Sequence, residues 1–235
     1  MTLNQGQNMA PYYQDEAIVP FKKNNGFKVV GITYDQCKDW LLHKHYAHRI
    51  PSISHAFGLY DKANNLVGIM TFGKPASYTL CEGICGSQYK DIVIELNRLV
   101  VNDGLMGCAS YFIARALRLL PKPSIVVSYA DPNHHHHGYV YQATNWIYTG
   151  LSSRERNYLM KTGEIITTRR HIDTKGTVVK TAYQLPKHRY VYFCGTKKYA
   201  KEMKAVLKYP TQPYPKGDNQ RYDASYQPGT QGLLM

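Results

Sequence analysis

The sequence has 235 residues, of which 29 are lysine or arginine and 16 are acidic, so the formal charge is +13 and the isoelectric point is near 9.4. A chain of this length can bury one sizeable core, and the absence of any run of eighteen apolar residues excludes a hydrophobic membrane span. We expect one soluble, cytoplasmic domain, because the first residues also lack the apolar stretch of a secretory signal.

The part of the chain before the core predicts simple elements. They are a mobile polar arm (1–26), a strand (27–34), an amphipathic helix (33–49), a hairpin (54–75) and a loop that could cover a site (76–92). Asp35 is a plausible N-cap of the helix, which should end before Pro51. The hairpin follows from two apolar runs joined by a turn around Asp61 to Asn65.

The core of the fold is expected between residues 93 and 150. It reads as a strand (93–101), a glycine-bearing turn (102–110), a helix (111–120), a second strand (124–130), a His-rich loop (131–139) and a helix (140–150). Both strands are continuous apolar runs, as strands covered on both faces require. Gly107 and Ser110 precede or open the first helix, where free N–H groups favour an anionic ligand. The glycines could equally do no more than shape a tight turn.

Basic residues gather after the core. Residues 151–195 alternate strands with basic turns, most clearly at 178–185 and 189–195, and a short helix (196–208) and a Pro/Tyr/Gly-rich, extended or disordered tail (209–235) follow. The chain also carries 21 tyrosines, and cations with stacking aromatics are typical of a nucleic-acid surface. We expect this half to grip a duplex, for which a homodimer would be suitable, through Arg154, Arg156, Arg169, Arg170, Lys187 and Arg189.

Chemistry is expected where the second core strand ends. Asp131 follows that strand directly, and four histidines, His134 to His137, come next. One or two of these imidazoles could join Asp131 as ligands of a transition metal, or the loop could be a hydrated turn with one structural histidine. Tyr141 is either a general acid near Asp131 or an aromatic core residue.

A second group of histidines ends the first predicted helix. His45 and His48 lie one helical turn apart and could share a ligand, with Tyr46 between them. Histidines at a helix C-terminus also simply favour the helix dipole, so both interpretations stay open.

Several of these segments together resemble one family. They are HY at 45–46, ELNRLVV at 95–101, SYFIARALRLLP at 110–121, VSYADP at 127–132, HHGYVYQATNWIYTG at 136–150 and PKHRYVYFCG at 186–195. Over residues 27–216 the sequence is similar to the Mom family of bacteriophage DNA-modification proteins. The extra histidines before Gly138 and the long tail depart from the pattern of that family.

The resemblance implies a single GNAT-type acyltransferase domain at 27–208: an α/β (α+β) fold with a mixed, bent central sheet, split near its fourth and fifth strands and flanked by helices. It implies conversion of adenine in double-stranded DNA to N6-carbamoylmethyl (acetamido) adenine, which protects DNA from host restriction. The implied catalytic residues are His45, Tyr46, Asp131 and Tyr141. The implied contacts to an acyl-CoA or another acyl donor are Arg98 and Ser110, with Gly107 beside them.

Iron is associated with the family, and we take His45, Asp131 and His137 as its expected ligands. Two other functions fit the same residues. One is a GNAT N-acyltransferase that acts on a protein or RNA amine, and the other is a DNA-binding protein without catalysis, whose His and Tyr residues are structural. A modified deoxyadenosine in cellular DNA would distinguish the first hypothesis from both.

Overall fold

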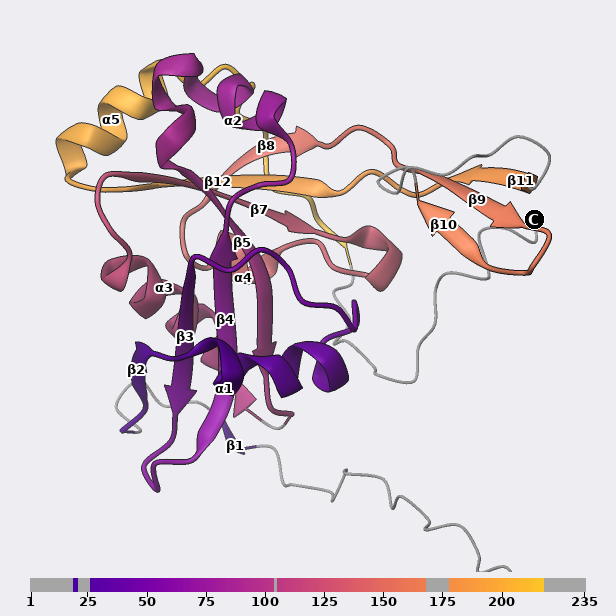
Figure 1. Cartoon of the computed structure of the whole chain (residues 1–235). Helices are drawn as coiled ribbons and strands as arrows, with labels where there is room; N and C mark the ends of the chain where they lie inside the picture. The colour runs from indigo at the N-terminus through magenta and orange to yellow at the C-terminus, as the bar shows by residue number, and fades with distance from the viewer. Residues whose placement is uncertain (1–18, 21–25, 104, 168–177, 218–235) are drawn as a thin grey trace, which may run out of the picture.

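The computed structural model describes residues 19–20, 26–103, 105–167 and 178–217. Its centre is a seven-stranded sheet in the order β2-β3-β4-β5-β7-β12-β8 (Figure 1). The strands are β2 (Lys28–Gly31), β3 (His55–Tyr60), β4 (Leu66–Gly73), β5 (Val93–Val101), β7 (Ser124–Ala130), β12 (His188–Cys194) and β8 (Ile147–Leu151). All neighbours are antiparallel except β5 and β7, which are parallel. The sheet is therefore mixed, as expected.

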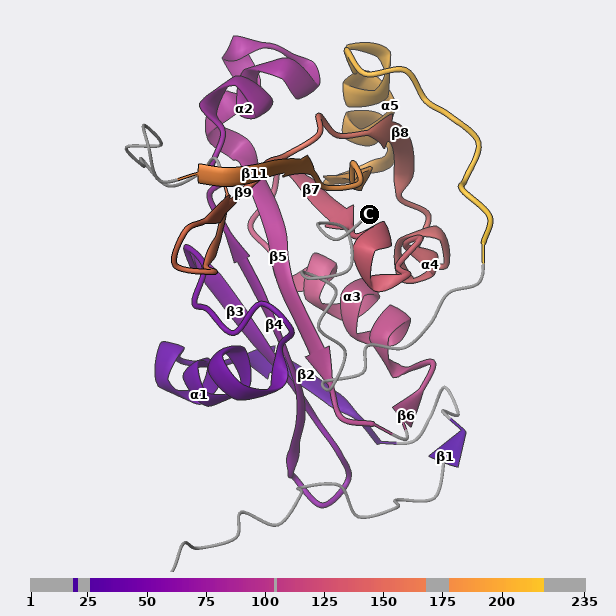
Figure 2. The same cartoon turned by 90° about the vertical axis from the view of Figure 1, so that its right-hand side faces the viewer.

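The parallel pair separates soon after it forms. Val93–Glu95 pair with Ile125–Val127, although β5 continues to Val101 and β7 to Ala130. At the point of separation the Ser128 hydroxyl donates a hydrogen bond to the Leu96 carbonyl at 2.8 Å. In Figure 2, β5 runs on towards β6 (Leu105–Met106), away from β7. This is a V-shaped split between the fourth and fifth strands of the sheet, and it confirms the expected GNAT-type fold.

Helices cover both faces of the sheet. Because successive strand residues point to opposite faces, Met70 and Val126 belong to one face, and Ile69 and Val127 to the other. The first face packs against α3 (Cys108–Leu119) and α4 (Tyr139–Gln142). The second face is covered by α1 (Tyr34–Asp39), a π-helical turn (Trp40–Lys44), α2 (Tyr78–Cys85) and α5 (Lys197–Ala205). A 3-10 turn (Ser87–Ile92) joins α2 to β5.

A smaller sheet stands beside the central one. Its antiparallel strands are β9 (Arg156–Met160), β10 (Ile165–Thr167) and β11 (Val178–Tyr183), in the order β10-β9-β11. We call this sheet the arm, since it projects from one end of the molecule, opposite α5 (Figure 1). A two-residue parallel bridge between β1 (Val19–Pro20) and β6 completes the strand pairing of the described residues.

The strands and the hairpin around β3 and β4 confirm the sequence predictions, but three predictions for other elements were wrong. The helix expected at 140–150 is α4 followed by β8, because Asn145 takes a left-handed φ of 60° and Ile147 begins pairing with β12. The loop expected at 76–92 contains α2, whose N-cap Ser77 accepts a hydrogen bond from the Leu80 amide. The helix expected to reach residue 49 ends in the π-helical turn at Lys44.

The last described residues lie along the domain. The Gln212 amide donates to the Tyr148 carbonyl at 3.0 Å, and the Tyr214 hydroxyl donates to the Trp146 carbonyl at 2.7 Å. Residues 209–217 are thus extended and held against β8 and the residues that precede it, while residues 218–235 of the predicted tail lie outside the described residues. Among the helices described, none has the length and apolar character to cross a membrane.

Candidate active site

His45 lies where the π-helical turn ends and the backbone becomes extended. Only 5% of the residue is exposed, and its Nδ1 atom accepts a hydrogen bond from the Ala47 amide at 3.0 Å. Burial, with the nearby Arg98 charge, lowers the pKa of His45 to about 3. The imidazole is therefore neutral at physiological pH, with its proton on Nε2, so it can act as a hydrogen-bond donor there.

Tyr46 brings two distant segments together. Its ring lies 4.3 Å from the His45 ring and 4.2 Å from the His134 ring, measured between centroids, and 6.3 Å from the His136 ring. Burial and the Asp131 charge raise the pKa of Tyr46. Burial also lowers the pKa of His134, and that of His136 to about 4. The clustered rings are thus all uncharged near neutral pH.

Asp131 comes directly after β7 and is 6% exposed. Its Oδ1 atom accepts hydrogen bonds from the Asn133 amide at 3.0 Å and from Asn133 Nδ2 at 2.7 Å. Its Oδ2 atom lies 3.1 Å from Lys187 Nζ. Burial alone would raise the pKa of Asp131, but the Lys187 charge and the Asn133 hydrogen bonds outweigh it and lower that pKa. The residue is therefore a carboxylate at neutral pH.

Tyr141 stands at the split, on the α3 face of the sheet. Its hydroxyl oxygen accepts a hydrogen bond from the Ser128 hydroxyl at 2.7 Å, and the Ser128 hydroxyl also faces the Leu96 carbonyl at 2.8 Å. Burial raises the pKa of Tyr141 to about 12. The phenol is thus protonated at neutral pH, and its ring packs on the Trp146 ring at 5.1 Å between centroids.

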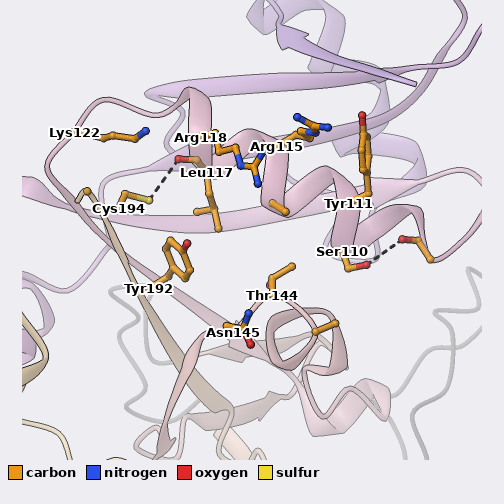
Figure 3. Close-up of a pocket in the computed structure, with 14 residues that line it drawn as sticks. Ser110, Tyr111, Arg115, Leu117, Arg118, Lys122, Thr144, Asn145, Tyr192 and Cys194 are labelled. Carbon is orange, nitrogen blue, oxygen red and sulfur yellow. Dashed lines mark hydrogen bonds between the residues drawn. The ribbon is translucent and has the colours of Figure 1, made fainter. Parts of the chain in front are cut away.

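A cavity of about 620 Å³ opens on the α3 face (Figure 3). Gly107 and Ser110, the residues of the expected anion site, line this cavity, and Gly107 has a left-handed φ of 80° that favours glycine. Sequence reasoning missed three cations in its wall, namely Arg115, Arg118 and Lys122. The spacing of 115 and 118 on one helical face was the available signal. Opposite them, Thr144 and Asn145 come from the segment between α4 and β8.

Two predicted site residues have surroundings that differ from their expected roles. Arg98 does not line the cavity; its guanidinium donates to the Asn97 carbonyl and its charge acts on His45 and Tyr46. Arg189 is 9% exposed, with hydrogen bonds to Thr149 Oγ1 and to the Thr149 carbonyl, both at 3.0 Å, so it is a structural residue rather than a DNA contact.

The other residues predicted to contact DNA lie in different parts of the molecule. Lys187 pairs with Asp131. Arg154 and Arg156 are exposed at the root of the arm and on it, respectively. Arg169 and Arg170 lie outside the described residues.

The residues present do not fit the expected iron site. The His137 ring packs on the His188 ring at 5.5 Å between centroids, away from the Tyr46 cluster. Both oxygens of the Asp131 carboxylate are already engaged, one of them by the Lys187 ammonium, which repels a metal cation. Across the described parts of the chain, no group of three His, Cys, Asp or Glu side chains is arranged to hold a metal ion. We derive no step through iron.

A split mixed sheet, with a cationic cavity on one face and a buried polar cluster on the other, defines an α/β protein of GNAT type. The chain belongs to the Mom protein family, whose profile matches residues 26–216. The resemblance noted in the sequence is therefore confirmed. No curated protein sequence matches the chain.

Several solved structures are similar in fold. A protein of Acinetobacter baylyi described as an acetyltransferase is 12% identical, with a TM-score of 0.45 over 76% of this chain and 97% of that one. A spermidine N-acetyltransferase from Vibrio cholerae, solved with CoA and spermine, is 12% identical, with a TM-score of 0.42 over 73% and 97%. A GNAT-family acetyltransferase from Bacillus cereus is 13% identical, with a TM-score of 0.40 over 72% and 99%.

Proposed function

We propose that the protein modifies double-stranded DNA by transferring a carbamoylmethyl group to the N6 amine of adenine. Family membership supports DNA modification, and the charge of +13 suits a polyanionic substrate. The observation that supports the proposal is the packing of Tyr46 against both His45 and His134, since the His134 amide donates to the Asp131 carbonyl at 3.0 Å at the end of β7.

The cavity is the proposed site of the donor. Arg115, Arg118 and Lys122 favour a donor with phosphate groups, because guanidinium and ammonium groups pair with phosphate oxygens. A CoA derivative would suit the cavity if it carried the carbamoylmethyl group through the methylene carbon, because that carbon, and not a carbonyl carbon, becomes bonded to N6. Ser110, in the first turn of α3, adds a hydroxyl near the positive end of that helix. The donor would approach the split from the α3 face, and the acceptor from the face that carries His45.

Adenine inside a duplex is inaccessible, so the base must be flipped out of the stack to reach the cluster. Tyr46 offers a ring against which the flipped base can stack. The N6 amine is a weak nucleophile, but its protons become acidic as the new N6–carbon bond forms. The Asp131 carboxylate can then take one of these protons, although its pKa is low.

The opposite charge develops on the donor as its bond to the transferred carbon breaks. Tyr141, protonated because its pKa is raised to about 12, supplies a proton to the leaving atom. The Nε2 proton of His45 supplies a hydrogen bond to developing negative charge. One proton is lost from N6 and one is gained by the leaving group, so the transfer is balanced.

The test is expression of the protein in bacteria, followed by mass spectrometry of nucleosides from total DNA. The wild type should produce deoxyadenosine that is heavier by a carbamoylmethyl group, and Asp131→Asn should abolish it. Asp91→Asn is the matched control, because this carboxylate is 84% exposed on the surface. If no modified deoxyadenosine forms with soluble wild-type protein, DNA is not the substrate, and RNA and protein amines from the same cells are analysed for an N-acyl product.

A further inference from the structure

Large side chains are exposed on the described strands of the arm. Its three strands hydrogen-bond to one another, and among the described residues no strand pairing joins them to the central sheet. Tyr183 is 57% exposed and Val179 is 62% exposed, which is unusual for large side chains on a short sheet. An exposed aromatic surface of this kind indicates a binding role.

We propose that the arm binds the backbone of duplex DNA beside the target base, through a surface patch formed by Arg156, Tyr158 and Tyr183. This inference rests on the proposed function, which supplies the duplex. It assigns the contacts with the DNA backbone to the arm, instead of to the basic half of the chain as a whole.

The patch is built by strand register. Tyr183 pairs with Arg156 and Thr181 pairs with Tyr158, so these side chains lie on one face of the arm. Arg156 donates a hydrogen bond to the Tyr183 hydroxyl at 2.9 Å, and its guanidinium lies 5.3 Å from the centre of the Tyr183 ring. The ring holds the guanidinium in place while leaving it exposed to solvent, where it can meet a phosphate.

Charge favours a polyanion over a protein partner. In the described residues between 151 and 187, the cations are Arg154, Arg156, Lys161, Lys180 and Lys187, and the carboxylates are Glu155 and Glu164. This excess of cations suits the phosphate backbone of nucleic acid, whereas a protein-binding face is usually depleted in charge at its centre.

The root of the arm places this patch near the candidate active site. The Leu185 amide donates to Asn133 Oδ1 and Asn133 Nδ2 donates to the Leu185 carbonyl, both at 3.4 Å. Asn133 in turn hydrogen-bonds Asp131. Tyr183 is two residues from Leu185, a span of at most about 7 Å along the backbone. DNA held on the patch would therefore lie beside the cluster that receives the flipped base.

The test measures binding of the full chain to a fluorescein-labelled DNA duplex by anisotropy, between about 50 and 200 mM salt. Arg156→Ala should weaken binding about fivefold to tenfold at the lower salt concentration and reduce the salt slope by about one phosphate contact. Arg156→Lys should restore most of the slope. Tyr183→Ala should weaken binding about twofold to fivefold, because it removes the ring and hydroxyl that hold the Arg156 guanidinium in place. Lys201→Ala, on α5 at the opposite end of the molecule, is the matched loss of one exposed cation.

Three results would overturn the inference in distinguishable ways. If the wild type binds the duplex and the arm variants bind equally well, the arm is not the grip, and the proposed function stands. If the wild type fails to bind DNA, or prefers an RNA duplex of the same sequence, both the inference and the DNA substrate fall. Light scattering completes the test: if Tyr183→Ala dissociates a dimer without affecting DNA binding, the patch is an interface between copies. Near-UV circular dichroism confirms that each variant is folded.

Discussion

The ion pair between Lys187 and Asp131 makes a prediction that can be worked out from the structure. Replacing Lys187 with methionine keeps the side-chain length and removes the charge, which leaves a buried carboxylate without its counter-ion. Attraction at 3.1 Å amounts to about 5 kcal/mol at an effective dielectric constant of about 20 and about 1 kcal/mol in water. The Lys187 side chain is 27% exposed, so the value lies between these limits.

The two hydrogen bonds from Asn133 to Asp131 should persist in the variant and reduce the loss of stability. We therefore expect Lys187→Met to lower the free energy of unfolding by about 2 kcal/mol at pH 7.5, less than the ~3–5 kcal/mol of a fully buried broken pair. The sign depends on pH. In the wild type the pKa of Asp131 is lowered, so its contribution is present above the unfolded pKa and is lost as the pH falls through the folded pKa.

In the variant, burial dominates and raises the pKa of Asp131 instead. The destabilisation should therefore be largest at neutral pH and should shrink below about 1 kcal/mol near pH 4.5, as the carboxyl takes up a proton. Urea denaturation at both pH values measures it, with Asp131→Asn and the double variant completing a cycle. Equal losses at both pH values, or a double variant no more stable than Lys187→Met, would refute this reasoning.

Three further predictions concern residues of the site and its surroundings. Tyr141→Phe should lower the transfer rate at least about 100-fold while costing only about 1 kcal/mol of stability, as measured by nucleoside mass spectrometry and urea denaturation; an unchanged rate would remove Tyr141 from the chemistry. The pKa of His45 is about 3, so between pH 7 and pH 5 the unfolded chain binds a proton at this residue and the native state does not. This difference should lower the free energy of unfolding by about 2 kcal/mol over that pH range. The His45→Asn variant should lack this decrease, and an unaltered pH dependence would contradict the neutral imidazole. Tyr209→Ala should lower the free energy of unfolding by about 1–2 kcal/mol, since the Tyr209 ring lies 3.5 Å from the buried Arg189 guanidinium. Tyr209→Phe should leave it nearly unchanged, as measured by urea denaturation.

The strongest sequence predictions were those with a single physical cause. The predicted strands at 93–101 and 124–130 match β5 and β7 residue for residue. The expectation that both faces are covered holds for β7, which is buried along almost its whole length, but not for β5, where only Val93 and Leu96 are buried because the strand continues past the split. Asp131 was located by its place at the end of such a strand. His45 and Tyr46 were proposed from the family resemblance, and their approach to His134 depends on a tertiary contact between segments almost ninety residues apart.

Other features lay beyond local patterns. The sequence at Ile147 and Tyr148 is compatible with a continuation of the helix α4. In the structure these residues pair with β12 and form a strand, so a contact with a distant part of the chain outweighs the local preference. Arg189 reads as one more surface cation, and only the positions of Thr149 and Tyr209 show that it is buried. The arm was recognised as basic, while its patch depends on the register between β9 and β11, which sequence alone leaves open.

The separate hydrogen-bonding of the arm has a consequence for how this protein can diversify. A substitution in β9, β10 or β11 alters no strand pair of the seven-stranded sheet, so it leaves the spacing of β5, β7 and the groups around their split unchanged. Among the described residues, Leu185, just after β11, joins the arm to the loop that follows β7 through its hydrogen bonds with Asn133. Mutations can therefore accumulate in the arm at little cost to the core, and this surface can change its preferences while the chemistry of the cluster is inherited intact.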